Sequence, residues 1–208
     1  MSKELTLDFG PITFQNRTIS KQQGSENKLY KKLSKHNYQR APKIENDIEL
    51  IKQLVRDCSE NEEINLLSKA FDSPNVILTF IDQIVEIYVS TWAITPAGIN
   101  SLMQIKSNGV CEEAWLFLDN THSYKWMFAS GAYKILKDSV HIKFAANHSK
   151  FTCMKLVDGS VLNLYGSMNL SNNPRWENIS INKSIEDFRF YSEFVKTVTG
   201  SMVERPEH

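Results

Sequence analysis

From residue 64 to residue 198, short apolar segments alternate with segments of helical periodicity, and this alternation restricts the chain to an α/β architecture. β-Branched and aromatic residues at 85–92 and an apolar run at 114–118 predict two buried strands. Between them, Thr95-Pro96 opens a helix that ends near Asn108-Gly109, because proline suits a first helical turn and glycine suits a helix end. The predicted elements are strands over 64–67, 85–92, 114–118, 139–145, 149–157, 160–166 and 177–182, and helices over 45–57, 74–83, 95–106, 122–136 and 184–198.

This order of elements predicts an α/β sandwich with a mixed central sheet flanked by helices. The composition agrees, since 41% hydrophobic and 23% charged residues are ordinary values for a globular protein. A chain of 208 residues is also long enough to bury a self-sufficient core.

The first 43 residues differ from the rest in charge. Eight basic residues lie between positions 17 and 43 against a single acid, and seven acids follow between 45 and 63. We therefore divide the chain into a polar basic N-terminal arm (1–43), a folded domain (44–200) and a C-terminal tail (201–208). The arm has two interpretations: a segment that follows nucleic-acid phosphates, or a solvated and partly disordered leader.

Over the whole chain the charges balance, with 24 basic and 24 acidic residues, so a globally basic surface cannot be the argument for nucleic-acid binding. Three widely spaced cysteines (Cys58, Cys111 and Cys153) form neither a disulfide framework nor a Cys-x-x-Cys metal site. No apolar run reaches the roughly 20 residues that a bilayer span needs, and the start does not resemble a signal peptide. The sequence predicts a cytoplasmic protein with no membrane partner.

Two polar segments stand at the ends of neighbouring strand candidates: Asn147-His148-Ser149-Lys150 and Gly166-Ser167-Met168-Asn169. If 149–157 and 160–166 form a hairpin, its open ends bring these segments together. Strand alternation would also place His148 and Lys150 on one face. An imidazole can attack phosphorus, while an ammonium, an amide and a Gly-Ser turn stabilise charge on phosphate oxygens. The cluster predicts phosphoryl transfer at a phosphodiester. It does not resemble a metal-binding cage, so neither a metal nor a cofactor is expected.

His148-x-Lys150 followed by Gly166-Ser167-x-Asn169 resembles the His-x-Lys…Gly-Ser-x-Asn signature of the phospholipase D superfamily. The segments 88–92 and 167–177, with Asn147, further resemble a phage- and mobile-element-associated branch whose members carry one motif. The resemblance covers about residues 64–197. It implies a phospholipase D-like sandwich, with these roles for the site residues: His148 as the phosphorus nucleophile, Lys150 and Asn169 as ligands of the phosphate oxygens, Ser167 as support for the turn, and Glu177 as an acid that orients an imidazole.

Enzymes of this superfamily use two motifs, one histidine as nucleophile and the other as general acid for the leaving oxygen. This chain has one motif, so the resemblance implies a homodimer in which two motifs face each other across a twofold axis. The short chain and the lack of a membrane-binding amphipathic helix favour nucleic acid, DNA first, over lipid. The predicted function is a metal-independent nuclease that forms a phosphohistidine intermediate. The alternatives are a catalytically silent nucleic-acid-binding or assembly protein with the same fold, and a lipid phosphodiesterase.

One position departs from the signature. An aspartate usually follows the motif lysine by five residues, and Lys155 stands there, with Asp158 three residues further on. The lysine at this position is the observation that favours a catalytically silent nucleic-acid-binding or assembly protein. A second His-x-Lys pair, His141-Ile-Lys143, has no Gly-Ser-x-Asn at a suitable distance, and we expect it to be structural.

Each site residue also has an ordinary structural interpretation. His148 could be a core histidine at a strand end, and Lys150 could be a solvated lysine at a sheet edge. Ser167 and Asn169 could be simple turn formers, and Glu177 could be a surface acid. The tryptophans Trp92 and Trp115 are expected in the core, as is Trp176, for which stacking on a base is the alternative.

Overall fold

The computed structural model of the protein describes residues 53, 58–59, 62–68, 73–171 and 177–200. The predicted basic arm (1–43), the C-terminal tail (201–208) and all but one residue of the predicted helix over 45–57 lie outside these residues, as does Trp176.

The described elements follow the order that the sequence predicts: β1 (Glu63–Ser68), α3 (Ser73–Thr79), β2 (Ile84–Thr91), α4 (Pro96–Ser107), β3 (Glu113–Asp119), α5 (His122–Ala129), α6 (Ala132–Leu136), β4 (His141–Ala145), β5 (Phe151–Leu156), β6 (Val161–Gly166), β7 (Glu177–Asn182) and α7 (Ile185–Thr197). Seven strands form one sheet in the order β1-β7-β6-β5-β2-β3-β4. The strand run at 64–67 and the last six predicted strands are all present, within a few residues at each end.

The sheet is mixed, as predicted. β2, β3 and β4 are parallel neighbours, and the connections between them carry α4 and the pair α5–α6. β5, β6, β7 and β1 are antiparallel, with β5 pairing directly with β2. The expected hairpin of β5 and β6 is confirmed, with Phe151 opposite Tyr165 at its open end.

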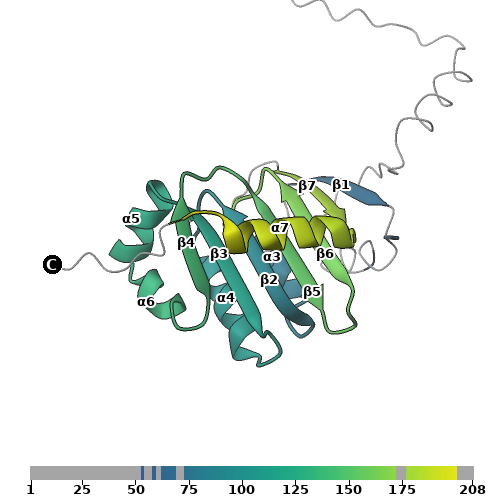
Figure 1. The fold of residues 1–208 in the computed structure, drawn as a ribbon, viewed down its shortest axis with the longest axis horizontal. Coiled ribbons are helices and arrows are strands. Elements are labelled where there is room, and N and C mark those ends of the chain that lie inside the picture. The colour runs from purple at the N-terminus through teal and green to yellow at the C-terminus, as the bar shows by residue number, and fades with distance from the viewer. Residues whose placement is uncertain (1–52, 54–57, 60–61, 69–72, 172–176, 201–208) are drawn as a thin grey trace, which may run out of the picture. The chain divides into compact units, whose positions relative to one another are not determined.

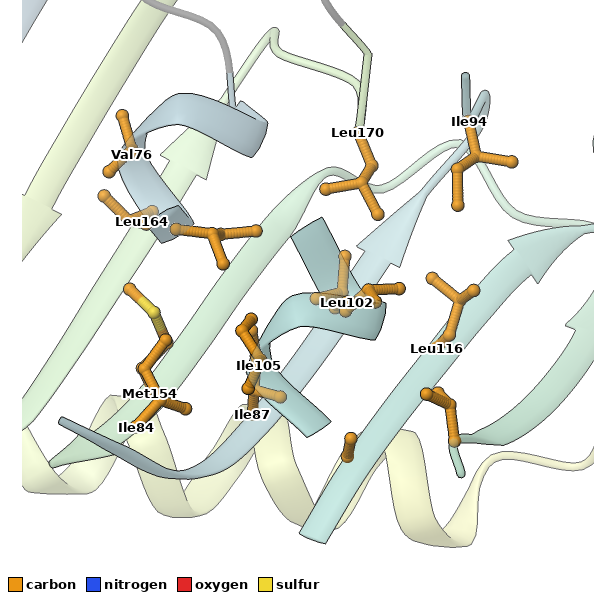
Figure 2. Close-up of a cluster of buried hydrophobic side chains, with 14 of the residues drawn as sticks. Val76, Ile84, Ile87, Ile94, Leu102, Ile105, Leu116, Met154, Leu164 and Leu170 are labelled. Carbon is orange, nitrogen blue, oxygen red and sulfur yellow. The ribbon is translucent and has the colours of Figure 1, made fainter. Parts of the chain in front are cut away.

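Helices cover both faces of the sheet, which makes the predicted α/β sandwich (Figure 1). On one face α7 lies across β2, β3, β5 and β6. The other face carries the larger core, where α4 contributes Leu102 and Ile105 and the strands contribute Ile87 and Leu116 (Figure 2). Burying each such side chain contributes about 1.5–3 kcal/mol to folding.

Two predicted helices have different bounds in the structure. The helix predicted over 122–136 is two helices, α5 and α6, separated at Ser130 and Gly131. Gly131 has a backbone φ of 76°, a left-handed conformation that stops an α-helix and that glycine adopts at little cost. The helix predicted over 74–83 ends at Thr79, and a turn occupies the residues before β2.

The strand directions bring several polar loops to one edge of the sheet. The parallel strands β2, β3 and β4 end at this edge, at Thr91, Asp119 and Ala145. Because β5 and β7 run the opposite way, they begin at the same edge, where β6 ends. In α/β sheets, ligands bind outside the carboxyl ends of the parallel strands, so this edge is the place for a site.

Candidate active site

The chain crosses the top of the sheet between β4 and β5, and this crossing carries His148. β4 is the edge strand and β5 pairs with β2, so the connection must pass over the ends of β3 and β2. That span covers three strand spacings of about 4.8 Å each, or roughly 14 Å. Five residues, 146–150, make the connection, and even fully extended they reach only about 20 Å between the strand ends. The loop is therefore drawn out rather than coiled.

Asn147 fastens this loop to the strands beneath it. Its side chain is buried, and its amide nitrogen donates to Ser90 Oγ at 3.0 Å, to the Thr91 carbonyl at 3.3 Å and to the Phe117 carbonyl at 3.2 Å. The first two acceptors belong to β2 and the third to β3. One amide therefore joins the crossing loop to the ends of both strands that it passes over.

The amide oxygen of Asn147 holds the residue on the other side of His148. It accepts hydrogen bonds from the backbone nitrogen of Ser149 at 2.9 Å and from its hydroxyl at 2.6 Å. Ser149 Oγ also lies 2.6 Å from Ser90 Oγ. Because the Ser149 hydroxyl donates to the Asn147 oxygen, the Ser90 hydroxyl must donate to Ser149 Oγ. Ser90 Oγ also accepts from the Asn147 amide nitrogen, so the three side chains form a closed ring of hydrogen bonds. His148 is therefore placed between two anchored residues.

Asp119, at the end of β3, supports the same loop from below. Its buried carboxylate accepts hydrogen bonds from the backbone nitrogen and hydroxyl of Thr121, and at 3.4 Å from the backbone nitrogen of Asn147. The acid thus links the start of α5 to the crossing loop.

His148 and Lys150 lie together, as predicted, although for a different reason. Both residues are in the loop before β5 and not in the strand, so alternation along a strand does not apply. The Lys150 ammonium lies 3.4 Å from His148 Nδ1 and donates to the His148 carbonyl at 2.9 Å. The His148 side chain is exposed, and Lys150 is half-buried. Partial burial lowers the pKa of Lys150, and the charge of Glu177 opposes that shift.

The Gly-Ser turn at the end of β6 adjoins Lys150. Gly166 donates from its backbone nitrogen to the Lys150 carbonyl at 3.4 Å. A side chain at Gly166 has no room, since a Cβ built there would lie 1.8 Å from the Asn178 carbonyl oxygen. Ser167 follows in the turn, where its hydroxyl donates to the Glu177 carboxylate and accepts from the backbone nitrogen of Asn178 at 3.0 Å.

The role that the resemblance implies for Glu177, orienting an imidazole, stays a prediction. Its carboxylate accepts from Ser167, and in the described residues it makes no hydrogen bond to the His148 ring. Its observed contact supports the turn, and its charge acts on Lys150.

Asn169 is fastened to the same strand end as Asn147. Its amide oxygen accepts from the backbone nitrogen of Ala93 at 3.2 Å and lies 3.4 Å from Thr91 Oγ1, whose single proton goes to the Ala93 carbonyl at 2.7 Å. A backbone N–H can only donate, which identifies the oxygen end of the amide. Thr91 Oγ1 also accepts from the backbone nitrogen of Leu170 at 2.9 Å. The amide nitrogen of Asn169 therefore points away from β2.

Three residues that sequence reasoning did not single out build this site: Ser90, Thr91 and Asp119. Ser90 and Thr91 are polar residues close to the end of the predicted strand 85–92, and Asp119 directly follows the predicted strand 114–118. Polar residues at these strand ends are the signal that could have identified them. Ser90 and Thr91 stand inside the segment 88–92, whose resemblance to the single-motif branch was noted without a role. The structure places them under both halves of the motif.

Trp92 is a correction to the sequence analysis. It is 37% exposed instead of buried, and its ring centre lies 5.7 Å from that of His148. Trp115 is half-buried on the α7 face, where its ring stacks on His141 at 4.5 Å and its nitrogen donates to Glu113 at 2.7 Å.

The second His-x-Lys pair has separate contacts. His141 begins β4, at the opposite end of that strand from the crossing loop. Lys143 is buried, and its ammonium donates to the carbonyls of Lys196 and Val198 at the end of α7. Burial lowers the pKa of this lysine.

Lys155, the residue that departs from the phospholipase D signature, also lies away from His148. Lys155 stands four residues into β5 and pairs with Glu86 of β2 at 2.8 Å. Asp158 lies in the turn between β5 and β6, where it accepts from the backbone nitrogen and hydroxyl of Ser160. Neither residue contacts the motif side chains in the described part of the chain.

Within the described residues, histidines, cysteines and carboxylates nowhere gather in groups of three or more that could hold a metal ion. None of the helices described combines the length and apolar character that crossing a bilayer requires.

The protein is an α/β sandwich, and its polar site lies at the sheet edge where the central strands β2 and β3 end. No protein-family profile and no curated protein matches the sequence. Similar solved structures include polyphosphate kinase from Porphyromonas gingivalis, at 8% identity and a TM-score of 0.55 over 74% of this chain and 28% of the kinase. That likeness shows a shared fold.

Two further solved structures are similar at lower scores. One is Nuc from Salmonella typhimurium, a phospholipase D family member, at 18% identity and a TM-score of 0.46 over 58% of this chain and 82% of Nuc. The other is a mutant of yeast tyrosyl-DNA phosphodiesterase 1, at 10% identity and a TM-score of 0.36 over 56% of this chain and 28% of the yeast protein.

The Asn147 amide generates a prediction about stability. Asn147→Ala leaves buried partners in β2 and in the crossing loop unsatisfied, and should lower the free energy of unfolding by about 1–3 kcal/mol. The matched control is Asn100→Ala, on the exposed side of α4, which should change it by about 0.5 kcal/mol or less. Urea denaturation measures both. Equal effects in the two variants would mean that Asn147 does not fasten the loop.

Proposed function

We propose that the chain is a metal-independent phosphodiesterase that cleaves nucleic acid, with DNA as the first candidate, through a phosphohistidine intermediate. The observation that supports this most directly is the pair of anchored loops at one sheet edge, which hold His148 and Lys150 beside the Gly166-Ser167 turn and Asn169. A histidine nucleophile, an ammonium and an amide are the groups that a phosphodiester displacement needs.

In the proposed first step, a ring nitrogen of His148 attacks phosphorus. The nitrogen–phosphorus bond forms as the bond to the leaving oxygen breaks, and that oxygen takes a proton from a second histidine. Lys150 and the amide nitrogen of Asn169 bind the non-bridging oxygens. In the second step, water gives a proton to the second histidine and attacks phosphorus, and the bond to His148 breaks. The result is a phosphomonoester and the enzyme in its starting state.

The contact between Lys150 and His148 gives the free site a defined starting form. An ammonium can only donate, so the His148 ring that receives it at Nδ1 carries its proton on Nε2. The unprotonated nitrogen that a nucleophile needs is then Nδ1, and a bound phosphate frees it because the phosphate oxygen competes with His148 for the Lys150 ammonium. The second histidine must instead be protonated on both ring nitrogens before it can give a proton to the leaving oxygen.

A second copy of the chain would supply the second histidine. One motif provides one histidine, and His141 stacks on Trp115 at the far end of β4. Because His148 is exposed at the sheet edge, a twofold dimer can bring two such side chains to one phosphate. The basic residues of the arm, 17–43, would follow the phosphates on either side.

The first prediction tests the choice of histidine. His148→Ala should abolish hydrolysis of bis-p-nitrophenyl phosphate and of oligonucleotides, because the nucleophile is lost while its exposed position leaves the fold intact. His141→Ala is the matched control and should keep most of the activity. Circular dichroism establishes that both variants fold. A comparable loss in both folded variants would show that the histidine was wrongly assigned.

The second prediction concerns metals. Activity should persist in excess EDTA, because the proposed phosphate ligands are lysine and asparagine. Glu177, whose charge acts on Lys150, belongs to no group of three or more metal-ligating side chains in the described residues. The measurement is the rate of nuclease digestion before and after chelation. Complete loss that a divalent ion restores would contradict the mechanism.

The third prediction concerns assembly. When inactive His148→Ala chains are mixed with an equal amount of wild type and allowed to exchange, a shared site leaves activity only in wild-type pairs, about one quarter of the dimers. Independent sites would instead keep half of the activity. Light scattering of the same samples measures the oligomeric state, and a strictly monomeric protein would favour the alternative of a silent nucleic-acid-binding protein.

A further inference from the structure

Trp92 presents an aromatic surface beside the proposed nucleophile. It is the first residue after β2, and its side chain is 37% exposed. Its ring centre lies 5.7 Å from the His148 ring, with 50° between the two planes. A large aromatic side chain at the rim of a polar site exposes apolar surface that a core position would have buried.

The backbone that carries Trp92 is held on both sides by the site itself. The Trp92 carbonyl accepts a hydrogen bond from Ser123 Oγ at 2.5 Å. Thr91 Oγ1 donates to the Ala93 carbonyl at 2.7 Å, and the Ala93 nitrogen donates to Asn169. The backbone from which the indole projects is therefore held relative to both halves of the motif.

Trp115 shows by contrast what a structural tryptophan looks like in this protein. Its ring stacks on His141 at 4.5 Å, the Lys143 ammonium lies 5.1 Å from the ring centre, and its nitrogen donates to Glu113. Trp92 lies beside His148, the residue that the proposed chemistry requires to be open to substrate.

We propose, on the basis of the function proposed above, that Trp92 is a specificity residue that stacks on a nucleobase next to the scissile phosphate. A base within a duplex is already stacked on both faces, so only an unpaired base can use the indole. Trp92 therefore directs the site to single-stranded nucleic acid.

The test compares two substrates with the same leaving group. Thymidine 5′-(p-nitrophenyl phosphate) carries a base, and methyl p-nitrophenyl phosphate does not. Trp92→Ala should raise KM for the thymidine ester by about 5- to 150-fold, the range for loss of one stacked base. It should leave kcat/KM for the methyl ester unchanged. Trp92→Phe should restore most of the loss, and Trp115→Phe is the control for removing a tryptophan elsewhere.

An equal loss on both esters would overturn the proposal, because Trp92 would then act by supporting His148. No loss on either ester would overturn it as well, while leaving the phosphodiesterase function intact.

A binding measurement separates this proposal from the proposed function. In the His148→Ala background, which prevents turnover, Trp92→Ala should weaken binding of a fluorescein-labelled oligothymidylate by a similar factor and leave duplex binding unchanged. If wild-type protein hydrolyses neither ester, the phosphodiesterase function fails, and this anisotropy measurement still decides the stacking. Unchanged affinity for the single strand would overturn it.

Discussion

The amide of Asn147 is the interaction on which the site depends. It is buried over the ends of β2 and β3, and both of its ends are used, the nitrogen toward the strands and the oxygen toward Ser149. A buried amide with all its partners is stabilising, whereas the same groups left without partners cost about 1–3 kcal/mol. An exposed histidine on a drawn-out loop would otherwise have no fixed position. With the amide in place, His148 is held by residues on both sides although its own side chain makes few contacts.

The end of β2 supports both halves of the motif. Ser90 holds the loop that carries His148, and Thr91 holds the turn that carries Asn169. The two motif halves are 16 residues or more apart in the sequence, and their geometry is set by a third segment about 55 residues upstream of the first half. Trp92 follows directly on the same strand. A single strand end therefore positions the proposed nucleophile, the proposed phosphate ligand Asn169 and the aromatic ring of Trp92 beside them.

Most of the fold could be predicted because hydrophobic pattern and turn residues act locally. The β5–β6 hairpin brought Lys150 to the Gly166 turn as its spacing predicts. The role of Asn147 could not be predicted, because it follows from β5 pairing with β2 and not with β4, and strand order is a property of the whole sheet. Trp92 was expected in the core because composition cannot show which aromatic residue lies at a strand end. The break at Gly131 was missed because flanking helical periodicity continues across it.

The number of residues in the drawn-out loop between β4 and β5 affects the sheet and the position of His148 differently. β4 pairs with β3, and β5 pairs with β2 and β6, so an inserted residue between Ala145 and Phe151 would change no strand register in the sheet. The same insertion would give the loop slack and release His148 from its register above β2. In a lineage of such chains, one added codon at this place could silence the site without a substitution at any residue of the motif.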